Sequence, residues 1–171
     1  MSASSPASRI QGNLQELFQK NFVSGNPYIK FQLTSEITAL MSMERVQETL
    51  IVEAGQITPL PSMPQSVIGI MNSRDRVFCV FDLPRLLTLP YSSLGERQYQ
   101  IIVLQTNSET PIYLGLAVNN IQGIMRLTSE QISSSTDAVS PELIDYVSGA
   151  ATSDKIPVLE FERIKSSIAT S

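Results

Sequence analysis

The sequence predicts a mainly β protein built as a small barrel or sandwich. Short apolar runs bounded by turn-forming residues recur along most of the 171 residues, and several alternate apolar with polar side chains, as half-buried strands do. Strands alternating with long helices are not seen, so a parallel βαβ sheet is not expected. A chain of this length suits one domain, or two small subdomains that share a core.

The first predicted element is a short amphipathic helix over residues 10–22. Polar side chains occupy one face, and apolar ones recur at helical spacing on the other, at Ile10, Leu14, Leu17, Phe18 and Phe22. An isolated helix of this length that also contains Gly12 is marginal in water. We therefore expect the apolar stripe to dock on the chain's own domain, with docking on a partner as the alternative. Residues 1–8, mostly Ser, Ala and Pro, predict a disordered tail.

The strands are predicted from residue 28 onward, where the apolar period changes from helical spacing to two. The expected strands cover 28–33, 37–41, 46–52, 67–71, 77–81, 101–104, 112–118, 121–127 and 156–159. Brief helices are expected at 83–89 and 141–146, and a terminal helix at 160–168. The best linker is the Pro-, Ser- and Gly-containing stretch after residue 89, which predicts a subdomain boundary near 90–98.

Residues 57–83 are the most informative segment. Pro59, Pro61 and Pro64 each fix φ and remove a backbone donor, so the loop that contains them is stiff and is neither helix nor central strand. A hairpin follows, with a polar turn at 72–76 between two apolar runs. A stiff loop beside a hairpin is typical of a binding scaffold rather than of a catalyst.

Composition excludes several classes of protein. Twelve basic and sixteen acidic residues give a net charge of −4, which argues against binding driven by nucleic-acid phosphates. A single cysteine and no histidine exclude an internal disulfide and the common zinc sites and favour a reducing, cytoplasmic location. No signal peptide, membrane-spanning stretch or nucleotide or calcium motif is present, so we expect neither membrane insertion nor a cofactor.

Two residues of the hairpin are candidate binding determinants. Arg74 lies in its turn, where a guanidinium could make a bidentate contact with a carboxylate on a partner helix; a solvated turn arginine is the alternative. Gly69 interrupts a buried strand, which predicts a bulge or the close approach of another backbone.

Catalytic alternatives rest on few residues. Cys79 lies in an apolar run, and without a histidine to activate it we expect a buried, inert thiol. Glu44 with Glu48, or Asp75 with Asp82, could be an acid and base pair, but the sequence offers nothing to complete an active site. A small enzyme that depends on the cysteine or on carboxylates is the remote alternative.

The same segments resemble the core signature of the CheW family of bacterial chemotaxis coupling proteins. The likeness is carried by Pro59-Leu60-Pro61, by the run VIGIMNSR at 67–74 and by VFDL at 80–83. Val46-Gln47-Glu48 corresponds to a Val-x-Glu that precedes the proline loop, and YLGLAVNNI at 113–121 is similar to a glycine-bearing strand and turn of the second half. The likeness covers residues 28–168, which leaves 1–27 as the tail and helix and 169–171 as a second tail.

The resemblance implies a CheW-like fold of two small five-stranded SH3-like β-barrels. It also implies a non-enzymatic adaptor that couples a CheA-type histidine kinase to the cytoplasmic tip of methyl-accepting receptors, in chemotaxis, phototaxis or twitching motility based on type IV pili. The kinase would contact the apolar barrel ends of the first half. We expect a cytoplasmic protein, monomeric alone and recruited to receptor arrays. The receptor-binding residues that the resemblance implies are Val46, Glu48, Gly69, Asn72, Arg74 and Asp75.

Three residues depart from the pattern of the family. Asp75 stands where a glycine usually follows the arginine, Cys79 replaces a usual proline and Asn119 a usual aspartate. Asp75 could also form a local ion pair with Arg74 and Arg76 that competes for the receptor carboxylate. These departures allow an alternative function, that of an accessory or antagonist paralogue that binds only the kinase, and they suit a pilus-motility or phototaxis branch.

Overall fold

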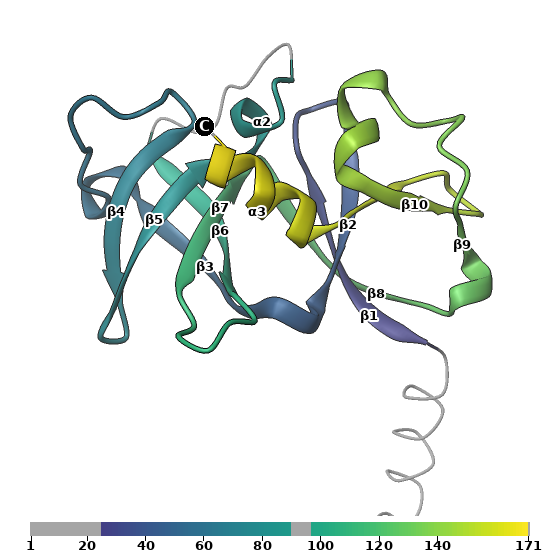
Figure 1. Ribbon diagram of the computed structural model, residues 1–171, viewed down its shortest axis with the longest axis horizontal. Helices are drawn as coiled ribbons and strands as arrows, with labels where there is room; N and C mark the ends of the chain where they lie inside the picture. Colours follow the sequence, from purple (N-terminus) through teal and green to yellow (C-terminus); the bar gives the residue numbers. More distant parts are fainter. Residues whose placement is uncertain (1–24, 90–96, 171) are drawn as a thin grey trace, which may run out of the picture.

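The computed structural model describes residues 25–89 and 97–170, and its strands form two curled sheets that lie side by side (Figure 1). The predicted N-terminal helix and most of the predicted linker lie outside the described residues. One sheet has five strands in the order β3-β6-β7-β5-β4, namely Val46–Glu53, Gln98–Gln105, Tyr113–Val118, Arg76–Asp82 and Val67–Ser73. The other has six in the order β8-β1-β2-β11-β10-β9, namely Asn120–Leu127, Asn26–Gln32, Thr38–Ser42, Pro157–Leu159, Val147–Ala151 and Ile132–Ser133.

The two sheets draw on different parts of the chain. The five-stranded sheet takes its strands from the middle, whereas the six-stranded sheet combines strands from both ends. β5 and β6, on either side of residues 90–96, therefore belong to the same sheet. Most neighbours are antiparallel, but β5 pairs with β7 and β11 with β2 in parallel.

Short helical elements connect the strands. They are η1 (Met43–Arg45), η2 (Ala54–Gln56), α2 (Leu83–Leu86), η3 (Ser129–Gln131), η4 (Pro141–Tyr146) and α3 (Phe161–Thr170). In Figure 1, α3 crosses the front of the molecule between the two sheets. Its residues Phe161 and Ile164 are buried, which anchors the helix in the core.

One apolar cluster joins the sheets. It contains Phe31 of β1, Leu104 of β6, Leu116 of β7 and Ile164 of α3, none of which exposes any surface. Burying such side chains contributes about 1.5–3 kcal/mol each. Because residues of both sheets share this cluster, it holds the sheets, and any site near their junction, in one arrangement.

The mainly β prediction is confirmed, and each predicted strand and helix within the described residues has a counterpart. The six-stranded sheet has one strand more than the five expected, and β9, which was not predicted, is only two residues long. β10 was not predicted, because its sequence, VSGAA, lacks a long apolar run. The predicted helix at 83–89 forms only over α2. In the described part of the chain, no helix is both long and apolar enough to cross a membrane.

Candidate binding site at the hairpin

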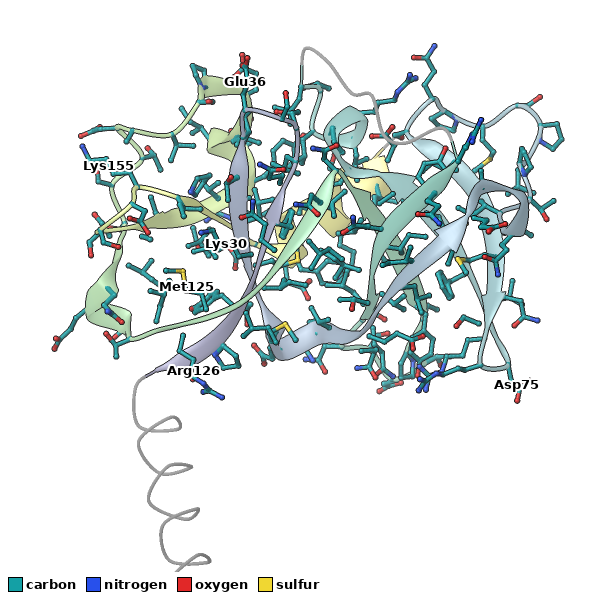
Figure 2. All side chains as sticks on the ribbon, turned by 180° about the vertical axis from the view of Figure 1, so that it is seen from behind. Lys30, Glu36, Asp75, Met125, Arg126 and Lys155 are labelled. Atoms are coloured by element: carbon teal, nitrogen blue, oxygen red, sulfur yellow. The ribbon has the colours of Figure 1, made fainter. Side chains whose placement is uncertain are left out.

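The hairpin of β4 and β5 turns through two residues. Ser73 pairs with Arg76, and the residues between them, Arg74 and Asp75, have φ of +52° and +63°. Positive φ at both central positions is the type I′ geometry, whose twist matches that of the flanking strands. Asp75 lies at the outermost point of the turn and projects away from the sheet (Figure 2).

Arg74 turns back from the tip toward β3. Its Nε lies 3.2 Å from Oε2 of Glu48, and Ser73 Oγ donates to Oε1 of the same carboxylate at 3.4 Å. β3 and β4 are the outer strands of their sheet, so these contacts close its curl. The Glu48 side chain is only 13% exposed, whereas that of Arg74 is 77% exposed. We call Glu48, Ser73, Arg74 and Asp75 the hairpin site.

Two further residues of the predicted set lie near the hairpin site. Val46 starts β3 and packs against the main core, and the ladder with β6 shifts register between Val46 and Glu48. Such a bulge places an extra residue in one strand and redirects the side chains beside it. Asn72 is exposed on β4, opposite Val77.

Gly69 lies at the other end of β4 and is buried. The ladder with β5 shifts register there, and a Cβ at this position would lie 2.2 Å from the carbonyl oxygen of Thr58. Thr58 and Ile70 exchange two backbone hydrogen bonds of 2.8 and 2.9 Å. Both the predicted bulge and the predicted close approach of another backbone are therefore confirmed. The structure does not bring Gly69 to the hairpin site, since four residues of strand span roughly 13 Å.

The ion pair that Asp75 could have formed with Arg74 or Arg76 is not among the contacts of the described residues. Arg74 pairs with Glu48 instead, and the guanidinium of Arg76 stacks on the ring of Tyr113, 4.3 Å from its centroid. The sequence could not reveal Tyr113 as a partner, because β5 and β7 are parallel neighbours only in the folded sheet. Ser73 was also missed, although serine is common at the start of a turn.

The proposed catalytic groups are not assembled. Cys79 is half-buried within β5 rather than fully buried as expected. Asp75 and Asp82 lie at opposite ends of β5, roughly 20 Å apart. Glu48 is held by the hairpin, while exposed Glu44 lies 3.8 Å from Arg45. Within residues 25–89 and 97–170, no group of three potential metal ligands occurs.

Asp82 has a structural role instead. It is buried, and its side chain accepts a hydrogen bond from the backbone N–H of Arg85 at 3.1 Å, which caps the start of α2. The other carboxylate oxygen of Asp82 lies 3.5 Å from Nε of Arg85. The charge is thus satisfied locally.

Fold and site together define a two-sheet β module with a polar hairpin site at its rim. The chain belongs to the CheW-like domain family, whose sequence model matches residues 27–169. It is similar to the chemotaxis protein CheW of Thermotoga maritima, with 28% identity over 83 residues that cover 48% of this chain and 52% of that protein. The aligned part thus spans about half the length of this relative.

Two other proteins extend the comparison. Protein FrzA of Myxococcus xanthus is 26% identical over 117 residues, which cover 67% of this chain and 71% of FrzA. The crystal structure of the scaffolding protein TtCheW from Thermoanaerobacter tengcongensis superposes with a TM-score of 0.65 at 20% identity, over 80% of this chain and 88% of that one. The superposition confirms the CheW-like fold.

Proposed function

We propose that this protein is a non-enzymatic adaptor that couples a CheA-type histidine kinase to methyl-accepting receptors. The observation that carries the proposal is the CheW-like family match over residues 27–169. The similarity to FrzA supports a motility branch of the family, so phototaxis or twitching motility stands beside chemotaxis as the output. Such an adaptor would work in the cytoplasm at receptor arrays, be monomeric alone, and bind neither nucleic acid nor a cofactor.

The hairpin site is the proposed receptor contact. The Arg74 side chain is largely exposed to solvent while Glu48 contacts its Nε. The two terminal nitrogens remain available for a bidentate contact with a carboxylate on a receptor helix. Val46 and Asn72 would border that contact. Gly69 would act indirectly, because its close packing under Thr58 fixes the proline loop.

The kinase contact is proposed for the apolar surface of the five-stranded sheet. Val77 and Ile112 are 67% and 59% exposed, whereas exposed Ile51 is level with Gln100 and Val118, at the other end of β7. The parallel register of β5 and β7, in which Cys79 faces Leu114, places Val77 beside Ile112. Exposed apolar side chains that lie together on a soluble protein are typical of a protein interface.

Titration calorimetry with two separate partners tests the proposal. The partners are the regulatory domain of the cognate kinase and a soluble fragment of the receptor that contains its cytoplasmic tip. We expect the protein to bind both partners. Arg74→Ala should weaken binding to the receptor fragment and leave binding to the kinase domain unchanged. Arg97→Ala is the matched control, since Arg97 is an exposed arginine at the opposite end of the β3 and β6 pair. Binding to neither partner would overturn the proposal.

An accessory paralogue that binds only the kinase is the second candidate. The departures from the family pattern at Asp75 and Asn119 motivate it. The ion pair adds to them, since a receptor carboxylate would have to share Arg74 with Glu48. In that case the calorimetry shows kinase binding alone, and Asp75→Gly should restore receptor binding by giving the turn the residue usual in the family. Receptor binding by the unaltered protein would remove this candidate.

A thiol probe separates both adaptors from the remote enzyme alternative. Cys79 is flanked in its sheet by Ile70 and Leu114. We expect slower labelling in the native protein than in urea, because the half-buried thiol packs against the main apolar cluster and the sequence contains no histidine to activate it. Fast native labelling coupled to loss of an activity would favour the enzyme.

A further inference from the structure

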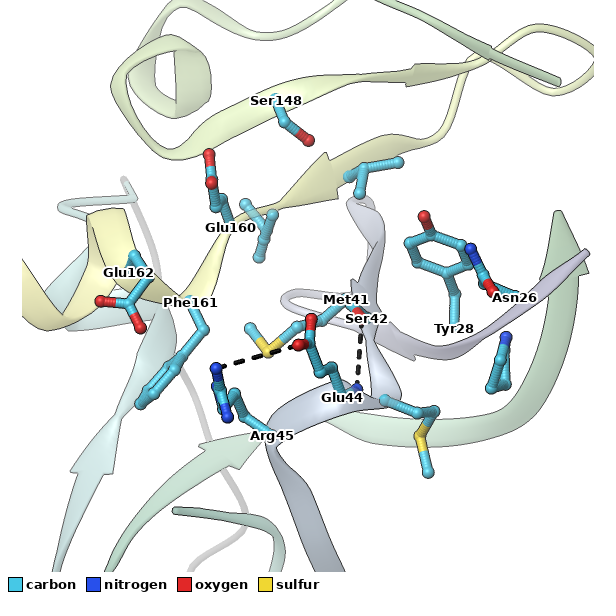
Figure 3. Close-up of a pocket in the computed structure, with 14 residues that line it drawn as sticks. Asn26, Tyr28, Met41, Ser42, Glu44, Arg45, Ser148, Glu160, Phe161 and Glu162 are labelled. Atoms are coloured by element: carbon cyan, nitrogen blue, oxygen red, sulfur yellow. Dashed lines mark hydrogen bonds and ion pairs between the residues drawn. The ribbon is translucent and has the colours of Figure 1, made fainter. Parts of the chain in front are cut away.

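An open pocket of about 580 Å³ lies beside the start of β1 (Figure 3). Its apolar lining comes from several elements, with Tyr28 from β1, Met41 from β2, Met43 from η1 and Phe161 from α3. Tyr28 and Met43 are half-buried and supply the accessible apolar surface, whereas Met41 and Phe161 are buried behind the pocket wall at 1% and 6% exposure. The pocket is distinct from the hairpin site, which contributes none of its lining residues.

Each charged residue that lines the pocket takes part in an ion pair, two of them with α3 residues outside the lining. Glu44 lies 3.8 Å from Arg45, Glu160 lies 2.9 Å from Arg163, and Glu162 lies 2.9 Å from Lys165. An occupant therefore gains little from a strong charge of either sign. A neutral, amphipathic segment suits this pocket better than an acidic or basic helix.

The chain itself supplies such a segment just before the described residues. Residues 10–22 carry one acidic and one basic side chain, Glu16 and Lys20, so their net charge is zero. Their apolar positions follow helical spacing and end with Phe18 and Phe22. An amphipathic segment of this kind needs an apolar surface on which to dock.

The covalent connection keeps this segment within reach of the pocket. Asn26 and Tyr28 belong to the pocket lining, and only three residues separate Phe22 from Asn26, a reach of about 10 Å. Gly25 fixes the point of entry, since its φ is +111° and a Cβ there would lie 2.3 Å from the carbonyl carbon of Leu127. Its carbonyl oxygen also accepts a hydrogen bond from Arg126 Nη1 at 3.2 Å.

We propose that the apolar face of residues 10–22 docks in cis into the pocket lined by Tyr28, Met41, Met43 and Phe161, with Phe18 and Phe22 as its anchors. The short tether gives the segment an effective concentration in the millimolar range or above, so a weak intrinsic affinity is sufficient. The docked segment would cover the surface beside η1, which leads directly into β3. The proposal concerns the protein alone and does not depend on its proposed partners.

Methionine methyl NMR of the full chain tests the docking. Met41 and Met43 report on the pocket, whereas Met63 and Met71, in the proline loop and β4, serve as remote controls. The double variant Phe18→Ser/Phe22→Ser should shift the Met43 methyl resonance and leave those of Met63 and Met71 in place. Gln15→Ser/Gln19→Ser, on the polar face, is the matched control and should shift none of them. Unchanged Met43 in the phenylalanine variant would overturn the proposal.

A spin label separates docking in cis from docking on a second copy. Cys79→Ser removes the native thiol, so that a nitroxide can be attached to Gln19→Cys alone. If the segment docks in cis, this nitroxide should broaden the Met43 methyl resonance and remove most of its intensity. A second sample mixes two kinds of chain: one carries the nitroxide but no ¹³C, and the other carries ¹³C-methyl methionine but no nitroxide. The Met43 resonance in this mixture should keep its intensity. Broadening in the mixture would mean exchange between copies, and absence of broadening in both samples would mean no docking; either result overturns the proposal.

Discussion

Arg74 and Glu48 form an ion pair of 3.2 Å between Nε and Oε2, although Glu48 lies in β3 and Arg74 directly follows β4, the two outer strands of the five-stranded sheet. Outer strands meet only when a sheet curls upon itself, so the pair marks where the curl closes. The carboxylate is shielded while the guanidinium faces solvent. This asymmetry presents the arginine to a partner and gives the glutamate a positioning role.

The ion pair should contribute little to stability. Because Arg74 is largely exposed, Arg74→Ala should lower the free energy of unfolding by less than about 1 kcal/mol. A double-mutant cycle with Glu48→Ala, measured by urea denaturation, should give a coupling energy of similar size. Arg97→Ala is the control and should change stability by less than about 0.5 kcal/mol. A loss above about 3 kcal/mol for Arg74→Ala would contradict this interpretation.

The residue at the tip should set the stability of the hairpin. Asp75 has a φ of +63°, which glycine adopts freely, aspartate tolerates and β-branched residues resist. Asp75→Val should lower the free energy of unfolding by about 1–2 kcal/mol, whereas Asp75→Gly should leave it unchanged or raised. Thermal unfolding of the unaltered protein and the two variants ranks their stabilities. Equal stability of the valine and glycine variants would show that the turn rearranges at no cost.

The sequence predicted the strands of this fold better than their arrangement. Period-two patterns and apolar runs located β1 to β8 and β11, because each has its own hydrophobic signal. β9 and β10 were missed because β9 is only two residues long and β10, VSGAA, has no long apolar run. The assignment of strands to sheets is non-local, since the order that places β3 and β4 at opposite ends of one sheet depends on the parallel pairing of β5 with β7.

The same distinction applies to the candidate site. The family resemblance singled out Arg74, which the turn alone left open as a solvated arginine, and a glycine in a buried strand indicated a close backbone approach at Gly69. Local pattern could not show that Glu48 would meet Arg74, that Tyr113 would hold Arg76, or that Gly69 would lie away from both. These relations arise from the curl and register of the sheet, which no single segment of the sequence determines.

Gly69 should be intolerant of any side chain. A Cβ there would lie 2.2 Å from the backbone oxygen of Thr58, and backbone that is held by two hydrogen bonds cannot easily move aside. Gly69→Ala should therefore lower the free energy of unfolding by about 2–3 kcal/mol. Gly55→Ala is the matched control, since nothing lies within 4 Å of a Cβ at Gly55. Urea denaturation of the two variants tests the difference, and equal stabilities would contradict the proposed packing.

Asp82 should matter for stability through its hydrogen bond more than through its charge. The side chain caps α2 through the backbone N–H of Arg85, and this short helix buries Leu83 and Leu86. Asp82→Ala removes the cap and should cost about 1–2 kcal/mol, whereas Asp82→Asn keeps an acceptor oxygen and should cost less. Arg85→Ala removes only a half-exposed ion-pair partner and should cost less than about 1 kcal/mol.

Urea unfolding of these three variants, with unchanged m-values, would establish the ranking. If Arg85→Ala is as costly as Asp82→Ala, the ion pair rather than the cap holds α2. If Asp82→Asn is as costly as Asp82→Ala, the buried carboxylate is needed for its charge. A capping role requires Asp82→Ala to be the most destabilising of the three variants. The capping role explains why an acidic residue stands in an otherwise apolar segment without any catalytic function.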